Sequence, residues 1–427
     1  MLTLALSLAL ALPAHSESSH GPIQWIEDDW ATAKTKAITD NKLLAVDVWA
    51  TWCHTCLAMK NYVFISGEFK QIADQHVWLG MDYDRPKNAS FFQKYAINAF
   101  PSFMVIDPKT DKVIARWLGS GTTEEMLNFF KNVNSAGDDN FSKGQIALSI
   151  QDYKAALPYF EKALKETKDR EKRTRVLSGY IEALRKSDKE NCAQKNLPYL
   201  DQVSNNAQGL DYVMMVSYCA DANKDSTKKN DILRALQKRL EAGLKSADLN
   251  VSVDDKSAIY ATLTSVYKQL KEKEKSTQTT LTRLRMLEEA AAQAPNAKAR
   301  GTFDAHRMSC YVSLMEYAKA EAMLLQSEKD LTQDFNTPWR LALLYRKQDR
   351  FNEGLQAIER ALKIGYGPRR VRLFSAKIDL AVGKKDFVLA RMTAEEARKE
   401  IAAQDPKLIR SYWLNELKAK EELIPKK

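Results

Sequence analysis

The chain has 427 residues, of which 44% are hydrophobic and 28% are charged, and its formal net charge is +10. This length excludes a single small domain, so we expect two or three domains with the composition of a soluble globular protein. Beyond its first residues, the sequence holds no stretch that is apolar enough to enter a membrane.

The N-terminal segment has the pattern of a secretion signal. An apolar run over residues 2–12 has the length of a signal-peptide core, is too short to span a bilayer, and is followed by the small residues Ala14 and Ser16. We therefore predict a signal peptide over residues 1–16 and a periplasmic or secreted protein, with no membrane span in the mature chain. No lysine or arginine precedes the run. A cytosolic protein with an apolar N-terminus is the alternative.

Helical and strand patterns alternate after this segment and predict an α/β domain, which we place at residues 17–137. Its strands are short apolar runs, and its last helix opens with a capping box in which a threonine precedes a glutamate by three positions. We expect helices over 25–41 and from Thr122 to about 132, and strands over 43–48, 77–82, 102–106 and 113–117.

Two cysteines lie between the strand at 43–48 and a helical segment at 57–63. Unpaired N–H groups and the positive end of the helix dipole stabilise a thiolate at a helix N-terminus, so Cys53 is expected to be the nucleophile. Cys56, one turn further along, is placed to attack a mixed disulfide on Cys53. The pattern predicts a redox-active Cys53–Cys56 disulfide.

The segment Trp49-Ala50-Thr51-Trp52-Cys53-x-x-Cys56 resembles the active-site segment of thioredoxins, and Asp47 stands where that family keeps a buried acid. Further along, Ala99-Phe100-Pro101-Ser102-Phe103 matches the place of the family's cis-proline, which faces the cysteines. The resemblance implies a thioredoxin fold and a thiol–disulfide oxidoreductase that needs no cofactor. It also implies that Phe100 and a cis Pro101 hold the backbone of a disulfide-bearing client.

The resemblance implies roles for further residues of this domain. Asp47 is expected to accept the proton of Cys56 during resolution, and an exposed aspartate at a strand end is the alternative. Many thioredoxins set a lysine of the neighbouring strand near this acid, but Gly80 occupies that position here. Trp52 is expected to contact clients, whereas Trp49 belongs to the core.

His54 lies between the two cysteines, where residues of this superfamily tune the redox potential. A protonated imidazole there stabilises the thiolate of Cys53 and makes the disulfide more oxidising. The alternative is an exposed polar side chain with little effect, and we group His54 with the client-facing residues.

The redox segment also resembles one branch of the family more than others. Residues 49–56 followed by 64–69 are similar to the periplasmic reductases, including the C-terminal domain of the membrane thiol:disulfide interchange protein, although Leu57 stands where that branch often has a lysine. A lone Cys-x-x-Cys is also half of a zinc site. The sequence shows no second cysteine pair or Cys/His cluster to complete one, so we expect no metal.

Small polar residues over 135–140 form a predicted linker, after which helical periodicity dominates the chain. Tyr317, Phe351 and Phe387 recur at spacings of 34 and 36 residues, close to the tetratricopeptide period. Residues 145–164 resemble a further copy, while the resemblance is poor between about 170 and 300. We expect an all-α, tetratricopeptide-like solenoid over residues 138–427.

The positive charge lies in this helical region, because residues 17–137 contain 12 basic and 14 acidic side chains. A basic region could bind nucleic acid or an anionic surface. However, its lysines alternate with glutamates on helical faces and no nucleic-acid-binding motif accompanies them. We therefore expect a solvated helical surface and no nucleic-acid partner.

Three cysteines lie outside the redox segment. Cys192 and Cys219 lie near the ends of two successive predicted helices, 189–203 and 210–223, which would bring them close if the helices are antiparallel. The sequence leaves two possibilities for Cys192 and Cys219: a disulfide between them, or two buried free thiols. Cys310 lies in a helical repeat and is expected to be a small core residue.

We interpret the chain as an exported thiol–disulfide oxidoreductase that reduces protein disulfides and is itself reduced by an unidentified thiol–disulfide donor. Its helical repeats are expected to recruit partners, since such arrays offer concave grooves for peptides and proteins. The alternative is a scaffold protein whose redox domain is a structural platform or a sensor. The cysteine pair, Asp47 and Pro101 together argue against an inactive redox domain.

Overall fold

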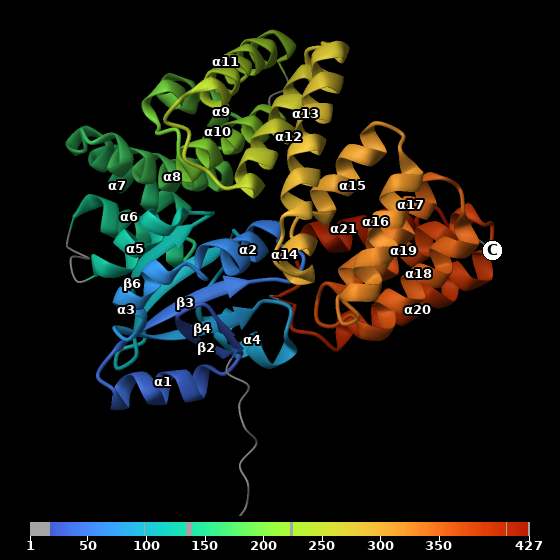
Figure 1. Cartoon of the computed structure of the whole chain (residues 1–427), viewed down its shortest axis with the longest axis horizontal. Coiled ribbons are helices and arrows are strands. Elements are labelled where there is room, and N and C mark those ends of the chain that lie inside the picture. Colours follow the sequence, from blue (N-terminus) through green and yellow to red (C-terminus); the bar gives the residue numbers. More distant parts are fainter. Residues whose placement is uncertain (1–17, 98, 134–138, 223–224, 407, 426–427) are drawn as a thin grey trace, which may run out of the picture.

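The computed structural model describes residues 18–97, 99–133, 139–222, 225–406 and 408–425. The predicted signal peptide, residues 1–16, lies outside them, as does most of the predicted linker. We call residues 18–133 the redox part and residues 139–425 the helical part; Figure 1 shows the first as a sheet flanked by helices and the second as helices alone. The proposed limits of the two domains remain 17–137 and 138–427.

One mixed sheet with the strand order β1-β2-β4-β3-β5-β6 forms the centre of the redox part. Strand β3 lies in the middle, parallel to β4 and antiparallel to β5, and its five central residues are buried. Because helices cover both faces of the sheet (Figure 1), the side chains of this central strand are buried on either side, which explains its long apolar run. The strands are β1 Ser18–His20, β2 Ile23–Glu27, β3 Leu43–Trp49, β4 His76–Asp82, β5 Ser102–Asp107 and β6 Lys112–Leu118.

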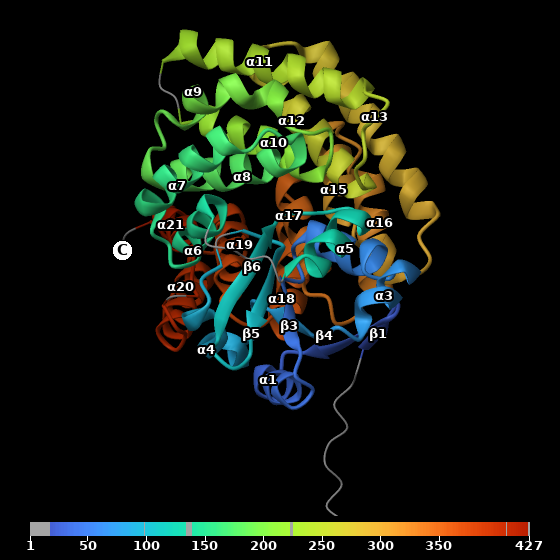
Figure 2. The ribbon, with the colours of Figure 1, turned by 90° about the vertical axis from the view of Figure 1, so that its left-hand side faces the viewer.

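Helices cover both faces of this sheet (Figures 1 and 2). The predicted capping box is present at the start of the last of them, where Thr122 and Glu125 exchange hydrogen bonds with each other's backbone N–H groups. The helices are α1 Trp30–Thr39, α2 His54–Ala58, α3 Lys70–Ala73, α4 Ala89–Lys94 and α5 Thr123–Lys131, with a π-helical turn η1 Met59–Val63 and 3-10 turns η2 Gly67–Phe69 and η3 Pro86–Asn88.

The prediction of a helix over 25–41 was wrong for its first residues. Residues 23–27 form strand β2, which pairs in parallel with β4, and the helix begins only at Trp30 after the N-cap residue Asp29. Ile23 and Trp25 are buried while the residue between them is exposed, which is the alternation of a strand. The partner strand lies about 50 residues further along the chain, so the pairing is set by tertiary structure.

Helices alone form the helical part, as the sequence predicted, and consecutive helices pack against one another. The three aromatic residues that recur in the sequence, Tyr317, Phe351 and Phe387, are the first residues of α16, α18 and α20. The helices are α6 Asn140–Ser149, α7 Tyr153–Glu166, α8 Arg170–Ser187, α9 Cys192–Asn196, α10 Ala207–Ala220, α11 Ser226–Lys245, α12 Val253–Gln269, α13 Lys273–Ala292, α14 Ala297–Gly301, α15 Asp304–Ser313, α16 Tyr317–Asp330, α17 Asn336–Lys347, α18 Phe351–Ile364, α19 Arg370–Gly383, α20 Phe387–Ala402 and α21 Ser411–Glu421, with a 3-10 turn η5 Leu197–Gln202.

The helical part curves around the redox part rather than extending away from it (Figures 1 and 2). Helix α6 contacts β6, α12 contacts α2, and α14 contacts η1. Leu408, in the connection between α20 and α21, packs into the core cluster that contains both cysteines of the redox segment. Within the described ranges, no helix has the length and hydropathy to cross a membrane.

Candidate redox site

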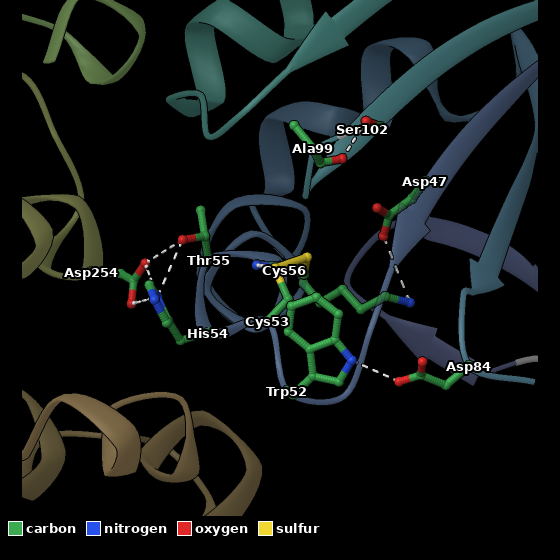
Figure 3. Close-up of a disulfide and its surroundings, with 11 residues drawn as sticks. Asp47, Trp52, Cys53, His54, Thr55, Cys56, Asp84, Ala99, Ser102 and Asp254 are labelled. Atoms are coloured by element: carbon green, nitrogen blue, oxygen red, sulfur yellow. Dashed lines mark hydrogen bonds and ion pairs between the residues drawn. A yellow bond between two sulfur atoms is a disulfide. The ribbon is translucent and has the colours of Figure 1, made fainter. Parts of the chain in front are cut away.

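A disulfide joins Cys53 and Cys56 at the start of α2 (Figure 3). Strand β3 ends at Trp49, and the turn that follows makes Cys53 the N-cap residue of the helix. The Cys53 sulfur accepts the backbone N–H of Cys56 at 3.1 Å. Cys53 is 7% exposed and Cys56 is 1% exposed, so Cys53 is the more accessible sulfur-bearing residue. This arrangement favours a thiolate on Cys53, because its sulfur takes one of the otherwise unpaired helix N–H groups.

The loop before β5 lies next to the cysteines, since Phe100 packs against the core cluster that contains both of them. The Phe100–Pro101 peptide bond is cis, as the resemblance implied. The carbonyl of Pro101 accepts the Gly119 N–H at 3.0 Å, which ties this loop to the end of β6. The ring of Phe100 packs edge-on against Trp52 at 5.2 Å between ring centroids. Trp52 and Phe100 thus form one aromatic surface beside the cysteines.

Asp47 lies on β3 near the disulfide, above and to the right of it in Figure 3, and is 1% exposed. In the part of the chain that the structure describes, neither of its carboxylate oxygens accepts a hydrogen bond, and the Lys60 ammonium is 3.8 Å from Oδ2. Burial raises the pKa of Asp47 to about 7, while Lys60 acts to lower it and Glu27 to raise it. A carboxyl group with this pKa can both take up and release a proton near neutral pH.

Lys60 supplies the positive charge near Asp47 that many thioredoxins take from a lysine on the neighbouring strand. Gly80 pairs with Asp47 in the β3–β4 register, and a Cβ on it would lie 2.2 Å from Oε2 of Glu27. The lysine comes instead from η1, where its ammonium is 3.1 Å from Glu27 and 4.2 Å from the ring centroid of Trp49. Its position four residues after Cys56, one helical turn on, was the only sequence signal for this role.

Trp52 is held in place by the redox part and by the helical part. Its indole N–H donates to Asp84 Oδ2 at 2.7 Å, and the guanidinium of Arg369 lies 4.3 Å from its ring centroid. Burial and the neighbouring Asp82 raise the pKa of Asp84 to about 7, against the lowering effect of Arg369. The tryptophan expected to contact clients is therefore in contact with the protein's own arginine.

His54 points away from the disulfide and toward the helical part (Figure 3). Its Nδ1 lies 3.0 Å from both carboxylate oxygens of Asp254 on α12, and the Thr55 hydroxyl donates to the same carboxylate at 3.0 Å. The ring of His306 on α15 packs against His54 at 3.9 Å between centroids. Asp254 and His306 were missed by sequence reasoning, because no local pattern marks residues that lie 200 or more positions from His54.

Other residues around the disulfide also contact the helical part. The side-chain amide of Asn336 donates to Thr51 Oγ1 at 3.1 Å, and the Arg410 guanidinium lies 5.0 Å from the ring centroid of Phe100. Further out, the hydroxyl of Tyr366 donates to Asp82 at 2.6 Å. The helical part is thus a structural component of the redox site.

The remaining cysteines lie in the helical part. A second disulfide joins Cys192, the first residue of α9, to Cys219 near the end of α10. Cys310 is a free thiol with no exposed surface, and burial raises its pKa. Cys310 therefore lies in the hydrophobic core, as expected from the sequence.

Comparisons with known protein families match the redox part and the helical part separately. Residues 25–108 match a thioredoxin-like family and residues 140–170 match a tetratricopeptide repeat. A thiol:disulfide interchange protein DsbD of Colwellia psychrerythraea is 32% identical over 75 residues, which are 17% of this chain and 12% of that protein. A thioredoxin H-type 2 of Nicotiana tabacum is 28% identical over 111 residues, 25% of this chain and 86% of that protein. A solved structure of the TPR2AB domain of yeast Sti1 matches 67% of this chain and 96% of its own at 15% identity, with a TM-score of 0.26.

Proposed function

Because residues 25–108 are a thioredoxin-like domain that carries a Cys-x-x-Cys disulfide, we propose that the chain is a thiol–disulfide oxidoreductase that reduces protein disulfides. The observation that carries this proposal is the position of Cys53, whose sulfur is the N-cap of α2 and accepts the Cys56 N–H. An inactive platform would not need this pair, a buried acid beneath it and a cis-proline beside it.

The proposed cycle begins with the reduced pair. The thiolate of Cys53 attacks one sulfur of a client disulfide, a mixed disulfide forms, and the other client sulfur leaves as a thiolate. Cys56 then attacks the Cys53 sulfur, which releases the second client thiolate and leaves the Cys53–Cys56 disulfide. The client gains two electrons and the cysteine pair loses two, so an external dithiol donor must regenerate the reduced protein.

Asp47 is proposed to accept the proton of Cys56 in the second step. Its raised pKa matches this role, since a base works best when its pKa is near the ambient pH. Lys60 is proposed to stabilise the carboxylate before the proton arrives and to be paired with Glu27 afterwards. Both residues lie on the buried side of the cysteine pair.

Clients are proposed to bind along Trp52, His54, Phe100 and Pro101. The side chains of Trp52, His54 and Phe100 each contact the helical part. A client must therefore bind to the surface that remains exposed or displace some of these contacts. Recruitment of clients by the helical repeats is a further part of the proposal, supported by the tetratricopeptide repeat at 140–170.

Export to an oxidising compartment is also proposed. Its support is the apolar run over residues 2–12 together with the second disulfide, Cys192–Cys219, in the helical part. Disulfides that serve structure are rare in the reducing cytosol and common in the periplasm and outside the cell.

Trapping of mixed disulfides tests the proposed function. Cys56→Ser removes the resolving thiol, so clients should remain covalently bound to Cys53 and be released by reductant. Cys53→Ser removes the nucleophile and should trap none. Equal trapping by the two variants, or none by either in the presence of disulfide-bonded proteins, would contradict the proposed cycle.

A further inference from the structure

Three potential metal-binding side chains meet at the boundary between the redox part and the helical part. They are His54 of α2, Asp254 of α12 and His306 of α15, and each offers a ligand atom within 4.8 Å of the others. Two of the chain's five histidines thus come together although 252 positions separate them. Neither the proposed exchange chemistry nor the comparisons assign a role to this cluster.

His306 has one ring nitrogen available for the cluster. Its Nδ1 is hydrogen-bonded to the Ser257 hydroxyl, which in turn accepts the Nε–H of Arg283 at 2.8 Å. The Nε2 atom is therefore the one left to act as a ligand, and Ser257 fixes the ring as an outer-shell partner typically does. His306 is 6% exposed, so its ring is held among packed side chains. A metal would bind it as the neutral imidazole.

Asp254 supplies a buried negative charge. It is 1% exposed, and its carboxylate is in hydrogen-bond contact with His54 and Thr55. One of its oxygens lies within 4.8 Å of a ring nitrogen of each imidazole, so it can complete a set of two nitrogen ligands and one oxygen ligand.

The distance between two of the three ligand atoms is close to that of a zinc site, and all three lie within 4.8 Å of one another. With Zn–N and Zn–O bonds of about 2.1 Å, a nitrogen and an oxygen ligand in a tetrahedral site lie roughly 3.4 Å apart. His54 Nδ1 is 3.0 Å from both oxygens of Asp254. A metal ion could thus replace the proton that His54 and Asp254 share, with little movement of either side chain.

We propose that His54, Asp254 and His306 bind a divalent first-row transition metal ion, with zinc the best match to two imidazoles and one carboxylate. The side chain of His54 is 34% exposed, which gives an ion access from solvent and leaves a coordination position open. The site connects the residue between the two redox cysteines to two helices of the helical part. It is independent of whether the cysteine pair catalyses exchange.

The competing explanation is an ion pair between His54 and Asp254 with His306 as a buried core histidine. In that arrangement the carboxylate is already satisfied by His54 and Thr55. The two explanations differ in what they predict for an added metal ion. Only the metal site binds it, and that binding depends on His306 and on its hydrogen-bond partner Ser257.

Zinc titration of the full-length, tag-free protein distinguishes them. The Cys53–Cys56 disulfide is kept oxidised so that its sulfurs cannot act as ligands, and a chromophoric chelator competes for Zn²⁺. One equivalent should bind with a dissociation constant in the micromolar range or tighter. Asp254→Asn and His306→Gln should each weaken binding at least about tenfold, and Ser257→Ala about tenfold through loss of the outer-shell hydrogen bond.

Matched variants control for general effects. His76→Gln removes another buried histidine, which lies on β4, and Asp255→Asn removes the neighbouring buried carboxyl group on α12. Both should bind zinc within about twofold of the unsubstituted protein. Bound Co²⁺ should give the visible absorption of a four-coordinate site and lose it in Asp254→Asn. Absence of micromolar binding, or binding by Asp254→Asn, His306→Gln and Ser257→Ala that equals that of the unsubstituted protein, would overturn the proposal in favour of the ion pair.

Discussion

At the scale of single residues, the buried acid Asp47 could be predicted from the sequence, whereas its positively charged neighbour Lys60 could not. Asp47 stands out because a carboxylate interrupts an apolar strand. Lys60 does not, because it is one lysine among many and its role depends on the direction in which η1 presents it to Asp47 and Glu27. The chemistry of a residue type can be read locally, whereas its partners are fixed by packing.

The raised pKa of Asp47 predicts a pH dependence of stability. The pKa is about 7 in the folded protein against a usual 3.8, so between these values the folded state holds a proton that the unfolded chain has released. This carboxyl group therefore lowers the free energy of unfolding as the pH rises, by about 2 kcal/mol between about pH 5 and pH 8. Asp47→Asn should remove that contribution.

Urea unfolding of the oxidised protein at several pH values measures this effect. The free energy of unfolding of Asp47→Asn, relative to that of the unsubstituted protein, should rise from pH 5 to pH 8, because effects of other buried acids such as Asp82 cancel in the difference. Asp74→Asn, at an exposed position, serves as the control and should give a flat difference. A flat difference for Asp47→Asn as well would show that Asp47 is ionised in the folded protein throughout.

At the scale of elements, the strand–turn–helix that carries the cysteines could be predicted because all its signals are local. Apolar residues of β3, the turn, and the cysteine spacing lie within 15 residues. The short strand β2 could not be predicted in the same way, since its pattern extends over five residues and its partner β4 lies far along the chain. The resemblance to thioredoxins located the site but not that strand.

Helix lengths explain why the repeats were visible only in places. Helices α16 and α18 have 14 residues each, close to the repeat pattern, and begin with the recurring aromatic residue. Helices α11 and α13 have 20 residues each, so the period is lost where they occur. The sequence therefore predicted a helical region without predicting how its helices are grouped, and the helix expected over 189–203 is instead the short helix α9 followed by the 3-10 turn η5.

The disulfide between α9 and α10 should contribute to the stability of the helical part. Cys192 and Cys219 are 27 residues apart, and a cross-link over such a loop restricts the unfolded chain by about 3 kcal/mol. The double substitution Cys192→Ala/Cys219→Ala should lower the free energy of unfolding by about this amount in urea unfolding under oxidising conditions.

Cys310→Ala is the matched control for that measurement, because it removes a buried sulfur without breaking a cross-link. Its cost should stay near 1 kcal/mol. Alkylation of the folded, air-exposed protein followed by intact-mass analysis should modify neither Cys192 nor Cys219. Labelling of both, or equal stability of the double variant and the unsubstituted protein, would exclude the cross-link in solution.

At the scale of the whole molecule, the two parts share one site. Four residues of the helical part contact the segment from Thr51 to His54: Asp254 of α12, His306 of α15, Asn336 of α17 and Arg369, the N-cap residue of α19. Their separation in sequence made these contacts invisible to pattern reasoning, which treated the helical part as an independent module. The charge pattern was easier to interpret: basic residues pair with acidic ones across helices, as in Arg350–Glu321 and Arg360–Glu328.

Whether the Cys53–Cys56 pair cycles in the intact protein is tested most directly by its equilibrium with glutathione. Full-length protein is equilibrated over a range of glutathione ratios, quenched by acid and alkylated, and the number of modified cysteines is read from the intact mass. We predict a single two-electron transition with a midpoint between about −120 and −270 mV, the range of exchange proteins. It should disappear in Cys53→Ser and in Cys56→Ser. A pair that stays oxidised or reduced across this range, or a transition unaffected by these substitutions, would contradict the assignment of this chain as a thiol–disulfide oxidoreductase.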